Sequence, residues 1–368
     1  MQDVHETSAP VGVTDAGPVI TRPEQLPGHL CPDPEILRPV VRTLPMRITP
    51  YFASLIKAPL DALARQVIPD PLELADACAD PDPLTEETQS PVPLIIHRYP
   101  RRVLFLVSNL CAVYCRFCMR KRHVGKSTGI PRQAVQEGLA YIQGHREINE
   151  VVLSGGDPLM LSGNELTDIL QALRRMKHVR ILRIHTRIPS AWPQRITSDL
   201  ARRLASFQPL FINLHFNHPD EITAEAALAC RRLADAGISL GSQTVLLKGI
   251  NDRPEALQNL LEGLLCIRVK PYYLHQIDRV PGTAHFQVPL DRGLKLIAAL
   301  RGRLSGMAIP HFMIDLPGGG GKIELLDDAI VQKNADHWLI RNFQGRIFNY
   351  PLEDDGRFLE TARDCKIE

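Results

Sequence analysis

The chain has 368 residues, of which 44% are hydrophobic, and its 43 Lys and Arg residues against 41 Asp and Glu residues leave a net charge of +2. This length is enough for a large α/β core, while the balanced charge argues against a dedicated nucleic-acid-binding protein or one held on an anionic membrane. No apolar run approaches the roughly 20 residues of a membrane-spanning helix, and the first residues lack a signal-peptide pattern, so we expect a cytoplasmic protein.

Four regions follow one another along the chain. Residues 1–30 are polar, rich in Pro and Gly and without periodicity, which predicts a flexible N-terminal arm. Residues 31–95 hold short helical patterns that end in proline-containing loops, so we expect a helical N-terminal region. In residues 96–305 short apolar runs alternate with longer amphipathic stretches, and residues 306–368 form a C-terminal segment.

The alternating region predicts a parallel α/β sheet. Because strand and helix patterns alternate, the connections should be right-handed crossovers, in either a (β/α) barrel or an open doubly wound sheet. We favour a partial (β/α)6 TIM-like barrel, since the polar and special residues follow the ends of strands, as in barrels. The expected strands are 103–107, 151–154, 181–185, 210–215, 239–247, 269–274 and 312–315, and the expected helices lie near 131–145, 163–177, 197–207, 221–236, 254–265 and 291–304.

The eight cysteines cluster only once, as Cys111, Cys115 and Cys118, which does not indicate a disulfide framework. Structural zinc prefers four ligands, and a redox iron-sulphur cluster usually takes four cysteines. Three thiolates therefore predict a [4Fe-4S] cluster with one iron open to a small molecule. The alternatives are a zinc-binding module completed by His123, a non-catalytic iron-sulphur electron carrier, or simply buried thiols.

Two glycine motifs follow later in the chain. Gly155-Gly156-Asp157, after the second expected strand, is either a tight turn or a place where the backbone approaches a ligand and Asp157 meets a cationic amino group. Residues 316–322 read Leu-Pro-Gly-Gly-Gly-Gly-Lys. The nucleotide P-loop pattern fails here, because position 316 is leucine and position 323 is isoleucine. This segment is either a flexible loop or a means of bringing Lys322 to pyridoxal phosphate as an imine.

The Cys-x3-Cys-x2-Cys spacing directly after an apolar strand resembles that of radical S-adenosylmethionine enzymes. From Arg47 to about Tyr350 the sequence is similar to the lysine 2,3-aminomutase family, which combines that chemistry with pyridoxal 5'-phosphate. The matching stretches are 90–93 (Ser-Pro-Val-Pro), 97–100 (His-Arg-Tyr-Pro), 153–157 (Leu-Ser-Gly-Gly-Asp), 193–197 (Pro-Gln-Arg-Ile-Thr), 215–219 (His-Phe-Asn-His-Pro), 270–273 (Lys-Pro-Tyr-Tyr) and 317–322.

The resemblance implies cofactors and a reaction. The cofactors would be a [4Fe-4S] cluster, S-adenosyl-L-methionine and pyridoxal 5'-phosphate, and the reaction would interconvert L-lysine and β-lysine by 1,2-amino migration. A reductant such as flavodoxin or ferredoxin and a homo-oligomeric assembly are expected as partners. The rival interpretations are a 2,3-aminomutase for another amino acid and a lysine aminomutase devoted to elongation factor P.

The resemblance also assigns residues. In bound L-lysine the α-carboxylate needs a cationic partner, and the ε-ammonium needs anionic ones. Relatives that act on glutamate would be expected to lose an acidic pair at the second position. The presence of such a pair here, Asp278 and Asp315, therefore favours L-lysine. By position, the cluster ligands are Cys111, Cys115 and Cys118; the S-adenosylmethionine residues are Gly155, Gly156, Asp157, His215 and Gln243; the pyridoxal phosphate residues are Lys322, Arg98, Tyr99 and Arg102; and the substrate residues are Arg120 for the carboxylate and Asp278 and Asp315 for the ε-ammonium.

The sequence departs from the family pattern in several places. Asp157 replaces the commoner glutamate. Arg253 stands where the best-known lysine aminomutases have a zinc-binding cysteine, and the tail carries only Cys365, so their structural zinc is not expected here. His275 replaces a tyrosine, which resembles the relatives that make β-lysine for elongation factor P, and the N-terminal region is shorter.

Overall fold

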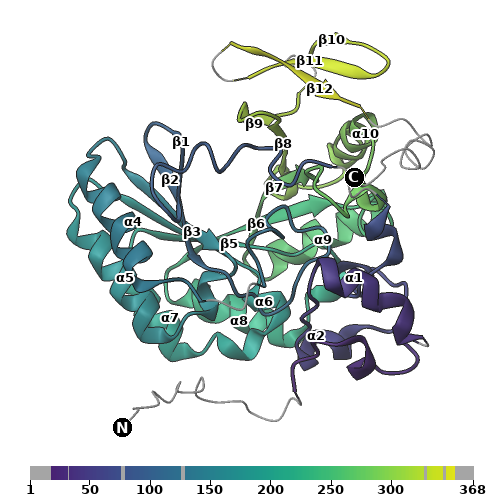
Figure 1. The fold of residues 1–368 in the computed structure, drawn as a ribbon, viewed down its shortest axis with the longest axis horizontal. Helices are drawn as coiled ribbons and strands as arrows, with labels where there is room; N and C mark the ends of the chain where they lie inside the picture. Colours follow the sequence, from purple (N-terminus) through teal and green to yellow (C-terminus); the bar gives the residue numbers. More distant parts are fainter. Residues whose placement is uncertain are drawn as a thin grey trace.

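A sheet of nine strands organises the molecule in the computed structural model (Figure 1). The structure describes residues 18–31, 33–75, 79–125, 129–326, 330–342 and 345–352. The strands of this sheet are β1 (Ile95–Tyr99), β2 (Arg102–Ser108), β3 (Glu150–Gly155), β4 (Ile181–Thr186), β5 (Leu210–Leu214), β6 (Ser239–Leu246), β7 (Lys270–Gln276), β8 (His311–Leu316) and β9 (Gly321–Glu324).

The strand order confirms the predicted barrel-type fold. Strands β2 to β8 are parallel to their neighbours, and β1 and β9 add antiparallel edges. The order runs from β1 to β9 without reversal. A doubly wound sheet would reverse its order at a switch point, so this sheet is the wall of a partial barrel.

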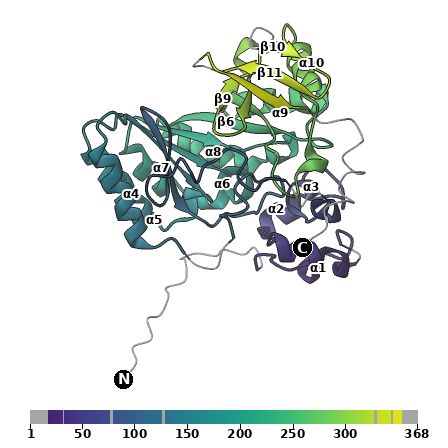
Figure 2. The same ribbon diagram turned by 45° about the horizontal axis from the view of Figure 1, so that its top comes forward.

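Helices cover the outer face of this wall (Figures 1 and 2). Each parallel connection carries a predicted helix, and the short α6 (Ile188–Ala191) precedes α7. Capping explains several starts: Ser162 accepts from the backbone N–H of Glu165, and Thr197 and Thr223 accept from residues three positions later. The connecting helices are α4 (Arg132–Gly144), α5 (Gly163–Arg175), α7 (Ser198–Ala205), α8 (Ala224–Asp235), α9 (Pro254–Cys266) and α10 (Leu290–Leu300).

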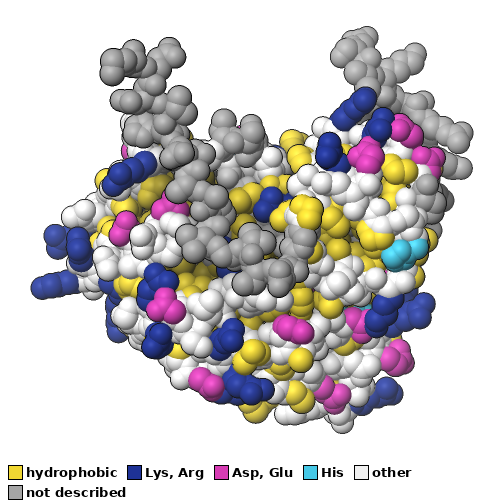
Figure 3. Space-filling model, turned by 90° about the horizontal axis from the view of Figure 1, so that it is seen from below, with side chains coloured by type: hydrophobic (Ala, Val, Ile, Leu, Met, Phe, Trp, Pro, Cys, Tyr) yellow, Lys and Arg dark blue, Asp and Glu magenta, His cyan; other side chains and the backbone are white. Residues whose placement is uncertain are grey.

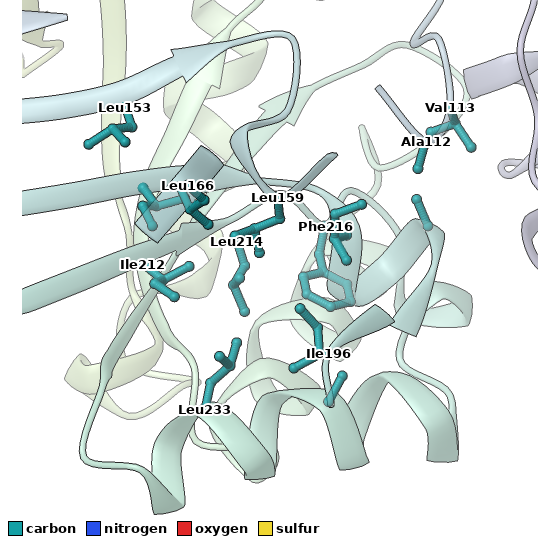
Figure 4. Packing of buried hydrophobic residues seen from close by; sticks show 14 of the residues in the cluster. Ala112, Val113, Leu153, Leu159, Leu166, Ile196, Ile212, Leu214, Phe216 and Leu233 are labelled. Carbon is teal, nitrogen blue, oxygen red and sulfur yellow. The ribbon is translucent and has the colours of Figure 1, made fainter. Parts of the chain in front are cut away.

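The main core lies between the sheet and these helices. Ile212 and Leu214 of β5 are fully buried and share this space with Leu233 of α8 (Figure 4). Side chains alternate along a strand, so Asn213 between them faces the interior of the barrel. The same alternation along β6 places Gln243 on the side of the cavity inside the barrel.

The N-terminal region holds the short helices α1 (Arg38–Thr43), α2 (Pro50–Leu55) and α3 (Ala64–Val67), and α2 contacts α6 of the barrel. The flexible arm predicted for residues 1–30 lies outside the described residues as far as residue 17. From residue 18 onward that prediction needs correction. Ile20 exchanges two backbone hydrogen bonds of 2.9 Å with Ile48, and Leu26 and Leu30 are buried, because these apolar side chains find a core that local polarity did not indicate.

The C-terminal boundary drawn at residue 306 also needs correction, since β8 and β9 complete the main sheet. Beyond them, β10 (Ile330–Lys333), β11 (His337–Arg341) and β12 (Ile347–Pro351) form a separate antiparallel sheet, drawn in yellow in Figure 1. Trp338 and Ile340 of β11 are buried against the C-terminal part of the barrel.

The surface reflects the balanced composition. Basic and acidic side chains are interspersed on the face seen from below (Figure 3). Within the described part of the chain, no helix has both the length and the apolar character needed to cross a bilayer.

Candidate active site

One cavity of about 370 Å³ collects every site residue predicted from the sequence. It opens where the parallel strands end, so residues that are far apart in the chain share its wall. The predicted site residues that line the cavity are Arg98, Tyr99, Arg102, Cys111, Cys115, Cys118, Arg120, Gly155, Gly156, Asp157, His215, Gln243, Asp278, Asp315 and Lys322. Segments of the chain from Arg98 to Lys322 therefore meet in one cavity.

The three cysteines lie in the loop after β2. Burial, followed by the charges of Asp157 and the other two cysteines, raises the pKa of Cys111, and burial raises the pKa of Cys118 to about 11. Thiols this close to one another would ionise readily only beside added positive charge, which iron supplies. Among the described residues, no three His, Cys, Asp or Glu side chains are grouped to hold one metal ion. Cysteine thiolates are the usual ligands of iron-sulphur clusters, so the chemistry of these three donors fits such a cluster.

Arg187 supports this loop from the end of β4, and no sequence motif singled it out. It is buried, and its Nη1 donates to the Sγ of Cys115 at 2.8 Å. Its Nη2 donates to the Oε1 of Gln66 at 2.5 Å and lies 3.2 Å from the Oε2 of Glu221. These partners hold a fixed positive charge beside one thiol of the cluster site.

The glycine turn after β3 packs directly on the cysteine loop. Gly155 has a φ of +113°, and a Cβ there would lie 2.3 Å from the carbonyl oxygen of Ser108. A Cβ on Gly156 would lie 2.5 Å from the carbonyl oxygen of Leu110. Both glycines are therefore required by the close approach of two backbones, in addition to any ligand that they contact.

Asp157 is held by protein donors. Its carboxylate accepts hydrogen bonds from the Thr186 hydroxyl at 2.8 and 2.9 Å, from the Arg187 N–H at 2.7 Å and from the Leu159 N–H at 3.0 Å. Burial raises its pKa to about 6, against these hydrogen bonds. In this structure Asp157 joins the turn after β3 to the end of β4, and its expected contact with a cationic amino group remains a prediction.

His215 and Gln243 line the same end of the cavity. The His215 ring stacks on Phe117, with centroids 5.7 Å apart, and its Nε2 lies 3.0 Å from the Nδ2 of Asn217. Burial lowers the pKa of His215 to about 3, so the ring is neutral at physiological pH. A neutral imidazole beside the cluster loop can exchange hydrogen bonds without adding charge.

Lys322 lies on β9 directly across from Asp315 on β8. Its ammonium pairs with the Oδ2 of Asp315, and its Nζ lies 3.4 Å from the Nδ1 of His275. The backbone N–H of Lys322 donates to the Tyr99 hydroxyl at 2.8 Å. Part of the glycine run before it is packed tightly, since a Cβ on Gly319 would lie 2.6 Å from the Gln89 side chain, whereas a Cβ on Gly318 would have open space around it.

Two arginines near Lys322 could meet an anionic group. Arg98 donates from Nε to the Oε1 of Gln89 at 2.6 Å, and its Nη1 lies 3.8 Å from Asp315. Arg102 lies over the Tyr99 ring, 4.5 Å from its centroid. With Lys322, these residues form a basic, aromatic corner that fits the phosphate and ring of pyridoxal phosphate.

The residues expected to bind substrate lie at the same cavity. Burial and the neighbouring Asp315 raise the pKa of Asp278 to about 7. Arg120 donates to the carboxylate of Glu86 at 2.6 and 3.2 Å. No sequence pattern singled out Glu86, because it lies in an irregular segment 34 positions before its partner.

Comparison with known proteins places this site in a family. The family described as "Lysine-2,3-aminomutase" matches residues 297–367, and the "Radical SAM superfamily" matches residues 105–261. The L-lysine 2,3-aminomutase of Clostridium subterminale is 45% identical over 314 residues, which are 84% of this chain and 76% of that protein. The L-lysine 2,3-aminomutase of Fusobacterium nucleatum is 44% identical over 84% of this chain and 74% of its own length.

An enzyme that is named for a different substrate is also similar to this chain. The glutamate 2,3-aminomutase of Clostridioides difficile is 42% identical over 84% of this chain and 73% of its own length. Radical S-adenosylmethionine enzymes carry a [4Fe-4S] cluster, and lysine 2,3-aminomutases also use pyridoxal phosphate, which agrees with the donor sets described above. Similarity of this extent, together with a cavity that unites three cysteines with Lys322, shows that the chain belongs to the lysine 2,3-aminomutase family of radical S-adenosylmethionine isomerases.

Proposed function

We propose that this protein is an L-lysine 2,3-aminomutase that moves the α-amino group of L-lysine to the β-carbon. The observation that carries the proposal is the acidic pair at the cavity, Asp278 and Asp315. Asp315 already pairs with an alkylammonium, that of Lys322, which is the chemical group that a lysine substrate presents at its far end. Arg120 supplies a guanidinium on the same cavity for the α-carboxylate.

When bound, the cluster and S-adenosylmethionine supply a 5'-deoxyadenosyl radical, and pyridoxal phosphate holds the migrating amino group. The chain's own residues position these groups. We assign Cys111, Cys115 and Cys118 to the cluster and Lys322 to the pyridoxal carbonyl. Arg98, Tyr99 and Arg102 would surround the rest of that cofactor, while Gly155, Gly156, Asp157, His215 and Gln243 border the S-adenosylmethionine side.

Charge explains why lysine is favoured over glutamate. A side-chain carboxylate placed against Asp278 and Asp315 would add a negative charge where Asp315 already raises the pKa of Asp278, and like charges in such surroundings cost several kcal/mol. An ε-ammonium instead neutralises one of the two carboxylates. The acidic pair therefore supports lysine as the substrate, even though a glutamate enzyme is among the relatives.

The proposal is tested by product identity. Protein reconstituted anaerobically with iron, sulphide and pyridoxal phosphate is given S-adenosylmethionine, a reductant, and either L-lysine, L-glutamate or L-arginine. NMR should detect β-lysine from L-lysine and little product from the other two amino acids. Turnover of glutamate or arginine without any β-lysine would contradict the substrate assignment. The absorbance spectrum of the reconstituted protein tests the aminomutase activity as such. A colourless protein, as expected of a zinc module, or a spectrum with cluster bands but without lysine-linked pyridoxal phosphate would contradict that activity.

The ionisation of Asp278 predicts a pH dependence. Its pKa is raised to about 7, so the carboxyl is protonated below that pH and negative above it. Because the ε-ammonium needs the negative form, kcat/KM for L-lysine should rise about tenfold from pH 6 to pH 8 through this group. Initial rates at low L-lysine concentration measure the effect. The rise should disappear in Asp278→Asn, and a rise of equal size in that variant would assign it to another group.

A further inference from the structure

The irregular segment at residues 82–90, ahead of the barrel, contacts two parts of the cavity through its backbone. The carbonyl oxygen of Leu84 accepts from the Nη2 of Arg98 at 2.8 Å. The carbonyl oxygen of Pro83 accepts from the N–H of Gly318, in the glycine run before Lys322, at 2.9 Å. This segment therefore has a fixed place against the cofactor side of the cavity, and its one buried carboxylate belongs to Glu86.

Glu86 accepts two hydrogen bonds from Arg120. Its Oε1 lies 2.6 Å from the Nη2 of Arg120 and its Oε2 lies 3.2 Å from the Nε, while the Glu86 side chain is only 5% exposed. Oε2 also accepts from the Nη2 of Arg122 at 3.1 Å. Burial would raise the pKa of Glu86, but Arg120 and then Arg122 lower it, so the group is a carboxylate at neutral pH.

The two hydrogen bonds to Glu86 use one edge of the Arg120 guanidinium and leave a second edge for another acceptor. A guanidinium carries five N–H donors in a rigid fork. Glu86 takes the edge formed by Nε and Nη2. Within the part of the chain that the structure describes, Arg120 donates to no other group, which leaves the two hydrogens of Nη1 and the second hydrogen of Nη2 for a ligand. Because Arg120 itself lines the cavity, its remaining edge can receive a second carboxylate while Glu86 stays in place.

We propose that Glu86 is a positioning residue, which fixes Arg120 so that its remaining edge receives the α-carboxylate of the substrate. A free arginine side chain would lose rotamer freedom each time substrate bound, and the contact with Glu86 removes that cost beforehand. This inference rests on one part of the proposed function, namely that the substrate is an amino acid bound in this cavity.

Loss of the Glu86 carboxylate would affect Arg120 more than Arg122. Arg122 pairs with Asp82 at 2.7 Å and lies 3.6 Å from Glu87, so it keeps acidic partners without Glu86, whereas Glu86 is the only carboxylate paired with Arg120 among the described residues. A glutamine at position 86 would offer Arg120 one oxygen acceptor, and its amide N–H₂ would face the other guanidinium donor. Arg120 would then turn to find another acceptor, and its free edge would leave the cavity.

The test uses anaerobic holoenzyme that carries the cluster and pyridoxal phosphate, without S-adenosylmethionine or reductant, so that no turnover occurs. The change in pyridoxal phosphate absorbance then gives the Kd for L-lysine. In Glu86→Gln we expect this Kd to rise about tenfold or more, as for loss of a hydrogen bond to a charged group. Under turnover conditions KM should rise similarly, while kcat should change less than about threefold. Glu86→Asp keeps the charge with a shorter reach, so its Kd should lie between those of wild type and Glu86→Gln.

Asp82→Asn is the matched control, because it makes the same acid-to-amide change on Arg122 without touching Arg120, and its Kd should match wild type. Tighter lysine binding in Glu86→Gln would overturn the proposal, since Glu86 would then occupy the place of the substrate carboxylate. An unchanged Kd, or a fall in kcat alone, would overturn it as well. If wild type binds another α-amino acid but not L-lysine, the substrate proposal fails, yet the Glu86 comparison still holds with that amino acid, because the α-carboxylate is common to both.

Discussion

Replacing Asp315 by asparagine should lower kcat/KM for L-lysine by about 100-fold, which corresponds to about 3 kcal/mol, within the range for removal of one partner of a buried ion pair. The Asp315 side chain is 9% exposed and would be one of two carboxylates facing the ε-ammonium. Initial rates of β-lysine formation measure the loss. Asp278→Asn should produce a loss of the same kind.

L-Norleucine is the control for this prediction, because it matches lysine in shape but lacks the ε-ammonium. Its binding, followed by pyridoxal phosphate absorbance, should be little changed in Asp315→Asn. Asp315 also pairs with Lys322, so pyridoxal phosphate content must be measured in each variant. An equal loss of binding for L-norleucine and L-lysine would mean that Asp315 serves the fold or the cofactor rather than substrate choice.

Glu73→Gln should lower the free energy of unfolding by about 3–5 kcal/mol, since it leaves a buried guanidinium without its anion. Glu73 pairs with Arg116 at 2.6 and 2.8 Å, and the Arg116 side chain has no exposed surface. Arg116 lies between Cys115 and Phe117, so the pair anchors the cysteine loop to the N-terminal region. Urea unfolding followed by circular dichroism measures the stability, and iron content after reconstitution should also fall.

Asp199→Asn is the matched control for that change. Asp199 pairs with Arg203 at 2.6 Å on the surface, where both side chains are about half exposed. An exposed pair contributes at most about 1 kcal/mol, so this variant should unfold almost as wild type does. Similar stability losses in Glu73→Gln and Asp199→Asn would contradict an anchoring role for the buried pair.

The regular part of the fold followed from local patterns. Apolar runs predicted the seven parallel strands, because a strand covered by helices must be apolar, and amphipathic stretches predicted the helices between them. Strands β1 and β9 to β12 were not predicted. They are four or five residues long, and β10 and β12 are largely exposed, so apolar residues mark them weakly. The alternating burial of β11, with Trp338 and Ile340 inward, was a signal that the sequence did contain.

The candidate site was predictable where one residue type suits one chemistry. Cysteine triplets, paired glycines and a lysine after four glycines are rare enough to indicate ligands, and the cavity does bring them together. Their protein partners were not predictable. Glu73, Glu86 and Arg187 are ordinary charged residues in sequence, and they matter because of what lies beside them in space.

The sequence by itself determined the order of strands and helices and the identity of the groups that can do chemistry, because hydrophobic periodicity and ligand preference are local properties. Only the tertiary structure decided which charges meet. The antiparallel register of β8 and β9 sets Lys322 against Asp315, the end of β4 brings Arg187 to Cys115, and the segment before the barrel brings Glu86 to Arg120. Charges pair according to their distance in the folded structure. The separation of two residues along the chain does not predict that distance.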